Sequence, residues 1–304
     1  MTKILITGGA GFIGSAVIKH FQKLDYDIFV IDNLSFGNRQ FINIADDHFL
    51  KMDILEKQKM EDVMMKIKPE IILHLAAIHF IPYCNQHPHE SANINIQGTM
   101  NVLDAAEKSK PKQILFASTA AVYPIYDEAV SEKHQTGPMD IYGLSKLAGE
   151  RLCNEFFLKT GITTIMCRFF NAFGPNETNP HLIPEIQDQV NSGMRKIKLG
   201  NLTPKRDFIH TYDMAAAVET LLNKVKSGID VYNLGRGIEY SVTEIVDAFS
   251  NQIGEKIEIE VDPARVRKVE RMHLLANIDK LKSLGWEPKI SIDEGISTLV
   301  KVTK

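Results

Sequence analysis

The chain has 304 residues, of which 24% are charged and 44% hydrophobic, and its formal net charge is −3. This is the composition of a globular protein large enough to bury a full core, and the small negative charge argues against nucleic acid or an anionic membrane as a partner. The sequence starts directly with a strand pattern, without a signal peptide, and contains no apolar run of membrane-spanning length. It therefore predicts a cytoplasmic protein.

Cysteines and histidines give no sign of a metal or disulfide. The three cysteines are odd in number and have no Cys-x-x-Cys spacing, so we expect neither a disulfide framework nor a zinc site. His79, His87 and His89 flank prolines in a predicted loop and have no ordered ligand spacing. We therefore predict no metal site.

The first predicted element is a strand over residues 3–6, followed by the glycine-rich turn Thr7-Gly8-Gly9-Ala10-Gly11-Phe12-Ile13-Gly14 and a helix over residues 15–21. We expect Gly8 to turn the chain off the strand, Gly11 to admit a pyrophosphate and Gly14 to let helix and strand pack closely. N–H groups at the start of the helix would face the phosphates. Because a strand precedes the glycines and a helix follows them, the pattern predicts a dinucleotide-binding site rather than a plain loop.

Strand and helix signals continue to alternate through the first two-thirds of the chain. Further strands are predicted over residues 28–31, 48–52, 71–74, 113–117 and 163–167, and helices over residues 56–66, 91–109 and 141–159. This alternation predicts an α/β fold with a doubly wound parallel sheet, which binds ligands beyond the carboxyl ends of its strands.

From about residue 171 the composition changes, because Gly, Pro and Asn become frequent and the helical patterns shorten. We therefore predict a dinucleotide-binding domain over residues 1–170, with segments returning from about 205–237 that include a strand over 231–234. Residues 171–304 would mainly form a smaller C-terminal α/β lobe for the substrate.

An acidic residue ends the second predicted strand. Asp32 lies eighteen residues after Gly14, where a carboxylate accepts hydrogen bonds from the adenosine ribose and repels a 2′-phosphate. This favours NAD over NADP. Asp53, at the end of the third predicted strand, could reach the adenine amine. The alternative is that Asp32 only stabilises a turn, because Asp-Asn-Leu-Ser is also typical turn sequence.

A tyrosine and a lysine share one face of a predicted helix. Tyr142 and Lys146 are four residues apart, and an ammonium together with an oxidised nicotinamide would lower the pKa of the phenol from about 10 toward neutral pH. The alternative is an exposed helical pair. Ser118, Thr119 and Tyr123 follow the fifth predicted strand, where a hydroxyl could donate to a sugar oxygen or could serve only a turn.

Together these motifs resemble those of the extended short-chain dehydrogenase/reductase superfamily, in particular its NAD-dependent nucleotide-sugar epimerase/dehydratase branch of the UDP-glucose 4-epimerase type. The resemblance spans nearly the whole chain and implies a Rossmann fold. Besides the glycine-rich turn it is carried by Asp32-Asn33-Leu34, Asp53-Ile54, His74-Leu75-Ala76-Ala77, Ser118-Thr119-Ala120-Ala121-Val122-Tyr123, Tyr142-Gly143-Leu144-Ser145-Lys146, Arg168-Phe169-Phe170-Asn171, Gly174-Pro175, Arg206-Asp207-Phe208-Ile209-His210, Tyr232-Asn233-Leu234-Gly235 and Leu284-Gly285-Trp286.

The resemblance also implies a set of site residues. The catalytic residues would be Thr119, Tyr142 and Lys146. NAD would be bound by Gly8, Gly11, Phe12, Ile13, Gly14, Asp32, Asn33, Asp53, Ile54, Leu75, Ala76, Ala77, Asn95, Ala117, Tyr142, Lys146 and Phe170. The nucleotide-sugar would be bound by Ser118, Thr119, Asn171, Leu182, Arg206, Phe208, Arg267 and Glu270. An arginine fork suits bidentate phosphate binding, but Arg267 lies in a basic run over residues 265–271 that could instead be a solvated face.

The implied function is an NAD-dependent 4-epimerase of a UDP-hexose, which oxidises C4 transiently and returns hydride to the opposite face. A 4,6-dehydratase or decarboxylase and a 4-keto-sugar reductase of the same family are alternatives, and an NAD-binding sensor without catalysis is a more remote one. Dehydratases usually carry Asp-Glu where this chain has Ala120-Ala121. Pro124, residues 79–84 and Leu274 depart from the family pattern near the sugar. The resemblance also implies a homodimer joined through apolar positions on the helices near 91–109 and 140–158, and the alternative is that these positions only pack in the core.

Overall fold

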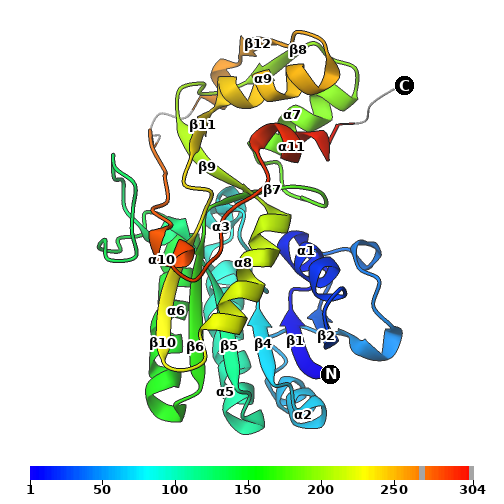
Figure 1. The fold of residues 1–304 in the computed structure, drawn as a ribbon, viewed down its shortest axis with the longest axis vertical. Coiled ribbons are helices and arrows are strands. Elements are labelled where there is room, and N and C mark those ends of the chain that lie inside the picture. The colour runs from blue at the N-terminus through cyan, green and yellow to red at the C-terminus, as the bar shows by residue number, and fades with distance from the viewer. Residues whose placement is uncertain (267–270, 301–304) are drawn as a thin grey trace.

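The computed structural model describes residues 1–266 and 271–300, which form two lobes stacked in Figure 1. The lower lobe is built on a seven-stranded parallel sheet with the strand order β10-β6-β5-β4-β1-β2-β3. Its strands are β1 (Thr2–Thr7), β2 (Tyr26–Asp32), β3 (Phe49–Lys51), β4 (Ile71–His74), β5 (Gln113–Thr119), β6 (Thr163–Phe169) and β10 (Ile229–Leu234). The predicted α/β fold class with a parallel sheet is confirmed, and the strand predicted over residues 231–234 is β10 at its edge.

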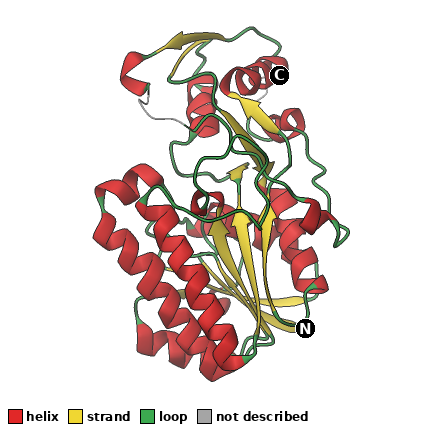
Figure 2. Ribbon diagram, turned by 90° about the vertical axis from the view of Figure 1, so that its left-hand side faces the viewer, coloured by secondary structure: helices red, strands yellow, loops and turns green. Residues whose placement is uncertain are grey.

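Helices cover both faces of this sheet, as Figures 1 and 2 show. One face is covered by α1 (Phe12–Phe21) and α8 (Thr211–Lys224), and the other by α2 (Lys57–Ile67), α5 (Gly98–Ser109) and α6 (Ile141–Thr160). Successive residues of a strand face opposite sides of a sheet. Ile4 and Ile6 of β1 therefore pack with α1 and α8, whereas Leu5 packs with α2 and α5, which explains the continuous aliphatic run.

The sequence analysis predicted a loop around His79, His87 and His89, after β4. This prediction is wrong, because most of that segment is helical. The chain forms α3 (Ile81–Gln86) and α4 (Pro88–Ala92) there. Each of these short helices has a proline in its first turn. At that position the missing N–H group has no partner to lose, so proline starts a helix instead of breaking one.

The single helix predicted over residues 91–109 is divided. A π-helical turn, Asn93–Gln97, separates α4 from α5. Asn95 in this turn is buried, and its side-chain amide makes hydrogen bonds of 2.8 and 2.9 Å with the backbone N–H and carbonyl of Ile78. It also donates to the Ser145 hydroxyl of α6 at 2.9 Å. The interruption of the helix thus coincides with contacts to distant segments.

The upper lobe has two small sheets and its own hydrophobic core. One sheet has the order β11-β9-β7, and in the other β8 and β12 pair in parallel. The strands are β7 (Asn171–Phe173), β8 (Lys196–Leu199), β9 (Lys205–His210), β11 (Glu239–Ser241) and β12 (Glu258–Val261). They pack with α7 (Leu182–Asn191), α9 (Val242–Ile253) and α11 (Ile292–Ser297), whereas α10 (Asp279–Lys282) contacts β10 of the lower lobe.

Buried aspartates fix the junction of the lobes. Asp207 of β9 accepts hydrogen bonds from the backbone N–H groups of Arg236 at 2.6 Å, Gly237 at 2.8 Å and Ala276 at 3.2 Å. Burial raises the pKa of Asp207 to about 6. These bonds tie β9 to the loop between β10 and β11 and to the segment that precedes α10.

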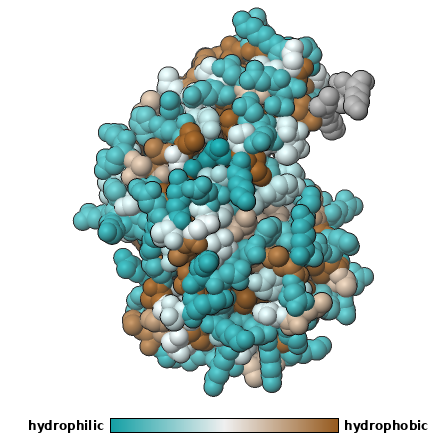
Figure 3. Space-filling view, in the orientation of Figure 1, coloured by the Kyte–Doolittle hydropathy of each residue, from teal (hydrophilic) through white to brown (hydrophobic). Residues whose placement is uncertain are grey.

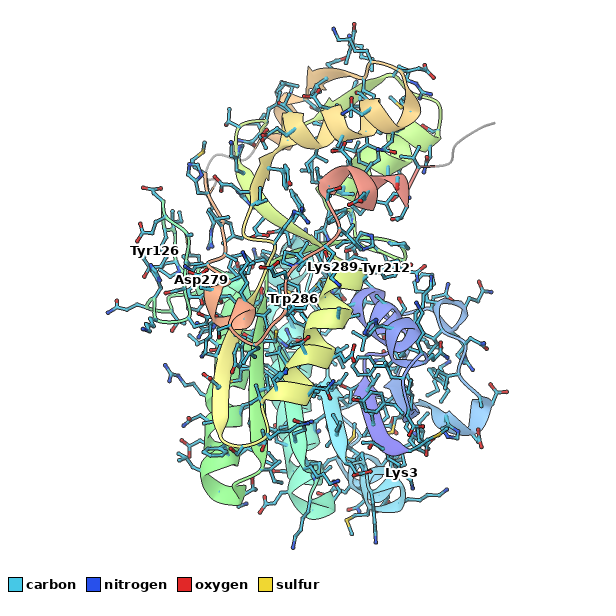
Figure 4. All side chains as sticks on the ribbon, viewed as in Figure 1. Lys3, Tyr126, Tyr212, Asp279, Trp286 and Lys289 are labelled. Atoms are coloured by element: carbon cyan, nitrogen blue, oxygen red, sulfur yellow. The ribbon has the colours of Figure 1, made fainter. Side chains whose placement is uncertain are left out.

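A second aspartate holds the C-terminal segment. Asp213, in the first turn of α8, accepts from the backbone N–H groups of Lys289 at 3.0 Å and Ile290 at 2.8 Å. In Figure 4, Lys289 and Tyr212 lie at the upper end of α8, where this segment crosses the junction, and Trp286 lies below them, buried in the core. No helix in residues 1–266 or 271–300 is long and apolar enough to cross a membrane.

Candidate active site

The two lobes enclose a cleft of about 980 Å³ at the carboxyl ends of the sheet strands. Its lower wall consists of the turns that follow β1, β2, β4 and β5, and its upper wall consists of β9 and the segment between β7 and α7. Figure 3 shows the surface hollowed between the two lobes on the right-hand side of this face. A cleft in this place and of this size suits a nucleotide ligand.

The glycine-rich turn lies against this cleft and has no room for side chains. Gly8 has a φ of +73°, and a Cβ there would lie 2.7 Å from the backbone nitrogen of Ala76. A Cβ on Gly14 would lie 2.3 Å from the carbonyl oxygen of Gly8. Gly11 is the N-cap of α1 and offers no side-chain hydrogen bond, so the first N–H groups of the helix remain available to a ligand. This arrangement fits the pyrophosphate of a dinucleotide.

Asp32 at the end of β2 is held in a fixed orientation. Its Oδ2 accepts from the backbone N–H of Ala10 at 2.9 Å and its Oδ1 from that of Leu34 at 2.8 Å. Burial raises the pKa of this carboxyl, against the effect of the two backbone hydrogen bonds. Next to it, the Asn33 amide donates to Asp53 Oδ2 at 2.8 Å. All three polar side chains line the cleft.

Tyr142 and Thr119 both line the cleft. Tyr142 is in the first turn of α6, which Asp140 caps by accepting from the backbone N–H of Gly143 at 2.7 Å. Thr119, the last residue of β5, lines the same cleft. Burial raises the pKa of the phenol, and the Thr119 hydroxyl lowers it. Burial has the larger effect, so the phenol of the protein alone is protonated at neutral pH.

Lys146 lies one turn further along α6. Its side chain is only 2% exposed, and its Nζ lies 4.2 Å from the centroid of the Phe116 ring. Burial lowers the pKa of the ammonium to about 8, so Lys146 is close to its titration range. A cation this poorly solvated interacts strongly with any phenolate or ribose hydroxyl brought beside it.

Two other hydroxyls, at the end of β5 and just after it, are bonded to buried side chains in the interior. Ser118 donates to Glu150 Oε1 at 2.5 Å, and Tyr123 donates to Asn233 Oδ1 at 2.8 Å. Arg168 pairs with Glu150 and also donates to the Tyr123 hydroxyl at 2.8 Å. Because successive strand residues face opposite sides, the side chains of Ser118 and Thr119 face opposite sides of the sheet.

Most of the residues predicted for the site come together here. The cleft is lined by Gly8, Gly11, Phe12, Ile13, Gly14, Asp32, Asn33, Asp53, Ile54, Leu75, Ala76, Ala77, Ala117, Ser118, Thr119, Tyr142, Lys146, Phe170, Asn171, Leu182, Arg206 and Phe208. Asn95 lies behind Ile78, whose backbone it holds. Arg267 and Glu270 fall outside the described residues. The roles of all these residues stay predictions.

Several residues that the sequence analysis did not assign also line the cleft. Arg271 donates to the carbonyl of Tyr123 at 2.9 Å, and its own carbonyl accepts from Arg206 at 2.7 Å. Arg271 belongs to the basic run over residues 265–271, which the sequence analysis noted. The run alone did not show whether its side chains face a ligand or solvent. Glu177 and His181 lie between β7 and α7 and gave no signal, because this segment has no regular periodicity.

The sheet and the glycine-rich turn at its carboxyl edge place the chain among the Rossmann-like nucleotide-binding α/β proteins. A model of the NAD dependent epimerase/dehydratase family matches residues 4–235, and the chain belongs to this family. It is 33% identical over 308 residues to a putative UDP-glucose 4-epimerase of Methanocaldococcus jannaschii, covering 99% of this chain and 98% of the relative.

Solved structures of epimerases have the same fold. The UDP-glucose 4-epimerase of Brucella ovis in complex with NAD is 26% identical, with a TM-score of 0.90 over 99% of this chain and 97% of that one. The UDP-glucose 4-epimerase of Thermotoga maritima with UDP-glucose is 28% identical, with a TM-score of 0.88 over 98% and 97%. The resemblance of the sequence motifs to this family is thereby confirmed.

Proposed function

We propose that the protein is an NAD-dependent 4-epimerase of a nucleotide-sugar, with a UDP-hexose as substrate. The observation that carries this proposal is that Thr119, Tyr142 and Lys146 line the same cleft as the glycine-rich turn. A tyrosine placed beside a second hydroxyl can remove the proton of a sugar hydroxyl and still hold the oxygen. The likeness to a UDP-glucose 4-epimerase solved with UDP-glucose supports the nucleotide and the reaction.

The cleft fits NAD by its own chemistry. The open N–H groups after Gly11 would bind the pyrophosphate, and the fixed carboxylate of Asp32 would accept from the ribose hydroxyls and repel a 2′-phosphate. Bound NAD would accept hydride from the sugar and return it.

The residues of the chain would handle the proton and the sugar. Tyr142 would take the proton of the 4-hydroxyl, Thr119 would hold the oxygen at C4, and Lys146 would orient the nicotinamide ribose. Because burial raises the pKa of Tyr142 in the protein alone, the phenol would stay protonated until the positive charge of the oxidised cofactor stabilises the phenolate. Asn171 and Arg206 of the upper wall would hold the diphosphate while the 4-keto sugar turns over.

The alternatives in the same family are less well supported. A 4,6-dehydratase needs an acid and a base beside the Ser/Thr, and the turn Ala120–Val122 offers only apolar side chains there. A 4-keto-sugar reductase that used NADPH would place a 2′-phosphate against Asp32. A sensor without catalysis would not need Thr119, Tyr142 and Lys146 together in the cleft. Apart from NAD, the 4-epimerase reaction needs only side chains that line the cleft.

We also propose that the protein acts in the cytoplasm as a homodimer. The outer face of α6 exposes Leu144 and Leu158, which are fourteen residues apart and so lie on nearly the same side of the helix. Met100 of the neighbouring α5 is also exposed. Two copies could bury these faces against each other around a twofold axis.

The proposed function is tested by incubating the purified protein, without added cofactor, with UDP-, GDP-, CDP- and dTDP-hexoses and following the sugars by NMR. We expect conversion of a UDP-hexose to its C4 epimer at unchanged mass, and no conversion with Tyr142→Phe. A product lighter by one water would contradict the epimerase and indicate a dehydratase. A protein that retains NAD but converts none of these sugars would favour a reductase or a sensor.

A further inference from the structure

Two segments that are far apart in the sequence flank the glycine-rich turn. The loop after β2 lies on one side, where the backbone N–H of Asn38 donates to the Ala10 carbonyl at 2.9 Å. The segment after β4 lies on the other side, where a Cβ on Gly8 would be 2.7 Å from the backbone nitrogen of Ala76. The sheet order β4-β1-β2 places the two segments on opposite sides of β1. A dinucleotide at the glycine-rich turn would therefore lie between them.

An aromatic contact joins these two segments. The ring centroids of Phe36, in the loop after β2, and Tyr83, in α3, are 5.5 Å apart, and the two ring planes are inclined at 83°. This edge-to-face arrangement is one that aromatic pairs prefer. Phe36 lines the cleft, as do Ile81 and Asn85 of α3. The contact therefore spans the cleft from one flank of the glycine-rich turn to the other.

Further contacts hold both rings in place. The hydroxyl of Tyr83 donates to Glu90 Oε2 at 2.9 Å, and its ring centroid lies 4.3 Å from that of His87. The backbone carbonyl of Phe36 accepts from the hydroxyl of Thr178 at 3.4 Å, and Thr178 belongs to the segment between β7 and α7. The loop that carries Phe36 thus contacts the upper lobe as well as α3.

The simplest alternative is that two surface rings only shield each other from water, since Phe36 is 38% exposed. The two explanations differ in what they predict for Tyr83. In the part of the chain that the structure describes, Tyr83 is not among the residues that line the cleft. It can therefore act on a bound ligand only through the segments that it contacts, and a simple shield would leave the ligand unaffected.

The contact is weak enough to open. An edge-to-face aromatic pair favours the closed arrangement by a factor of about 2 to 12. The rings are in contact in the protein alone, so the contact opposes the entry of a ligand as well as its release. If it is equally stable with and without the ligand, a change in its strength alters both rates and leaves the affinity nearly unchanged.

We propose that Phe36 and Tyr83 form a gate over the dinucleotide, and that separation of their rings sets the rate at which the cofactor enters and leaves the cleft. The inference rests on the proposed function for the identity of this cofactor as NAD. Neither residue takes part in the transfer of hydride or protons. The gate would keep the cofactor in place while the sugar is oxidised, when loss of the reduced cofactor would leave a 4-keto sugar that could not be reduced again.

The test is the rate at which the loaded protein exchanges its cofactor. Protein that carries radiolabelled NAD is diluted into excess unlabelled NAD, and the label that stays bound is followed over time. Equilibrium dialysis gives the dissociation constant. We expect Tyr83→Ala to release NAD about 3- to 10-fold faster than the natural protein and to change the dissociation constant by less than about 2-fold. Tyr83→Phe keeps the ring and should release NAD at the natural rate.

Tyr126 provides the matched control. Its ring meets that of His134 edge to face at a centroid distance of 4.9 Å. It lies on the opposite side of the molecule from α1, as Figures 1 and 4 show. Tyr126→Ala should therefore change neither the release rate nor the dissociation constant.

A double variant tests whether the two rings act as a pair. Tyr83→Ala should have no further effect on release in a Phe36→Ala background, because the contact is already lost. Additive effects of the two substitutions would overturn the gate. So would faster release by Tyr83→Ala with an equally large rise in the dissociation constant, which would assign the rings to the binding surface.

The outcomes separate this inference from the proposed function. Gated exchange of NAD in a protein that converts no sugar would support the inference and contradict the epimerase. Conversion of a UDP-hexose by a protein whose release rate Tyr83→Ala leaves unchanged would overturn the inference and leave the epimerase standing. Thermal unfolding midpoints of the variants exclude loss of folding as the cause.

Discussion

Arg168 of β6 and Glu150 of α6 form a bidentate ion pair inside the lower lobe. Arg168 Nε lies 2.9 Å from Glu150 Oε1 and Nη2 lies 2.8 Å from Oε2, and both side chains are only 7% exposed. Burial opposes the charge of Arg168, but the hydrogen bonds and charge of Glu150 raise its pKa, so the guanidinium is always charged. The pair anchors the helix that carries Tyr142 and Lys146 to the sheet beside Thr119.

We expect Arg168→Met to lower the free energy of unfolding by about 3–5 kcal/mol, because it leaves the Glu150 carboxylate buried without its cation. Urea denaturation of both proteins measures this difference. The exposed pair Lys159–Glu107 provides the control, and Lys159→Met should cost less than about 1 kcal/mol. The double variant Arg168→Met/Glu150→Leu should recover most of the loss. An Arg168→Met variant as stable as the natural protein would show that the interior hydrates this carboxylate.

Asp32 should decide between the two nicotinamide dinucleotides. Asp32→Asn removes a charged acceptor of ribose hydroxyl hydrogen bonds, so NAD should bind about 10- to 100-fold more weakly. NADP should bind relatively better, because the repulsion of its 2′-phosphate is removed. Titration calorimetry with both dinucleotides gives the ratio of their dissociation constants, in which any general loosening of the turn cancels. A ratio that stays the same would mean that Asp32 supports only the turn through Ala10 and Leu34.

The sequence predicted the parts of the fold that depend on local pattern. The glycine-rich turn between β1 and α1 could be predicted because its glycines meet demands that arise within the turn itself. Gly8 has a positive φ, and a Cβ on Gly14 would clash with the carbonyl oxygen of Gly8. The central strands could be predicted because a strand buried on both faces is aliphatic along its whole length. The predicted end of β2 likewise placed Asp32 at the carboxyl edge of the sheet, where the cleft lies.

Features that depend on distant contacts could not be predicted. The π-helical turn at Asn95 coincides with hydrogen bonds to Ile78 and Ser145, and neither partner is a neighbour in sequence. Ser118 and Thr119 were both expected at the sugar, but only the folded sheet shows that the Ser118 hydroxyl bonds Glu150.

Thr119 should set the pH at which the proposed reaction becomes fast. The Thr119 hydroxyl lowers the pKa of Tyr142, and turnover needs the ionised phenol, so the rate rises with pH through that pKa. Thr119→Val removes the hydroxyl and should move the acid limb of the kcat profile upward by about one pH unit, the equivalent of one hydrogen bond. Thr119→Ser keeps the hydroxyl and should restore the limb. A Thr119→Val profile that loses rate equally at every pH would assign Thr119 to sugar binding alone.

The proposed homodimer can be tested on the outer face of α6. Leu144 and Leu158 are 53% and 69% exposed, and burying such side chains against a second copy would contribute about 1.5–3 kcal/mol each. Leu144→Glu/Leu158→Glu would place like charges opposite each other across a twofold axis, so it should convert the dimer to a monomer. Light scattering on a sizing column measures the mass directly. Met65 of α2 is similarly exposed at 44% and provides the control, since Met65→Glu should leave the mass unchanged. A natural protein that elutes as a monomer at every concentration, or a double variant that stays dimeric, would show that this face does not join two copies.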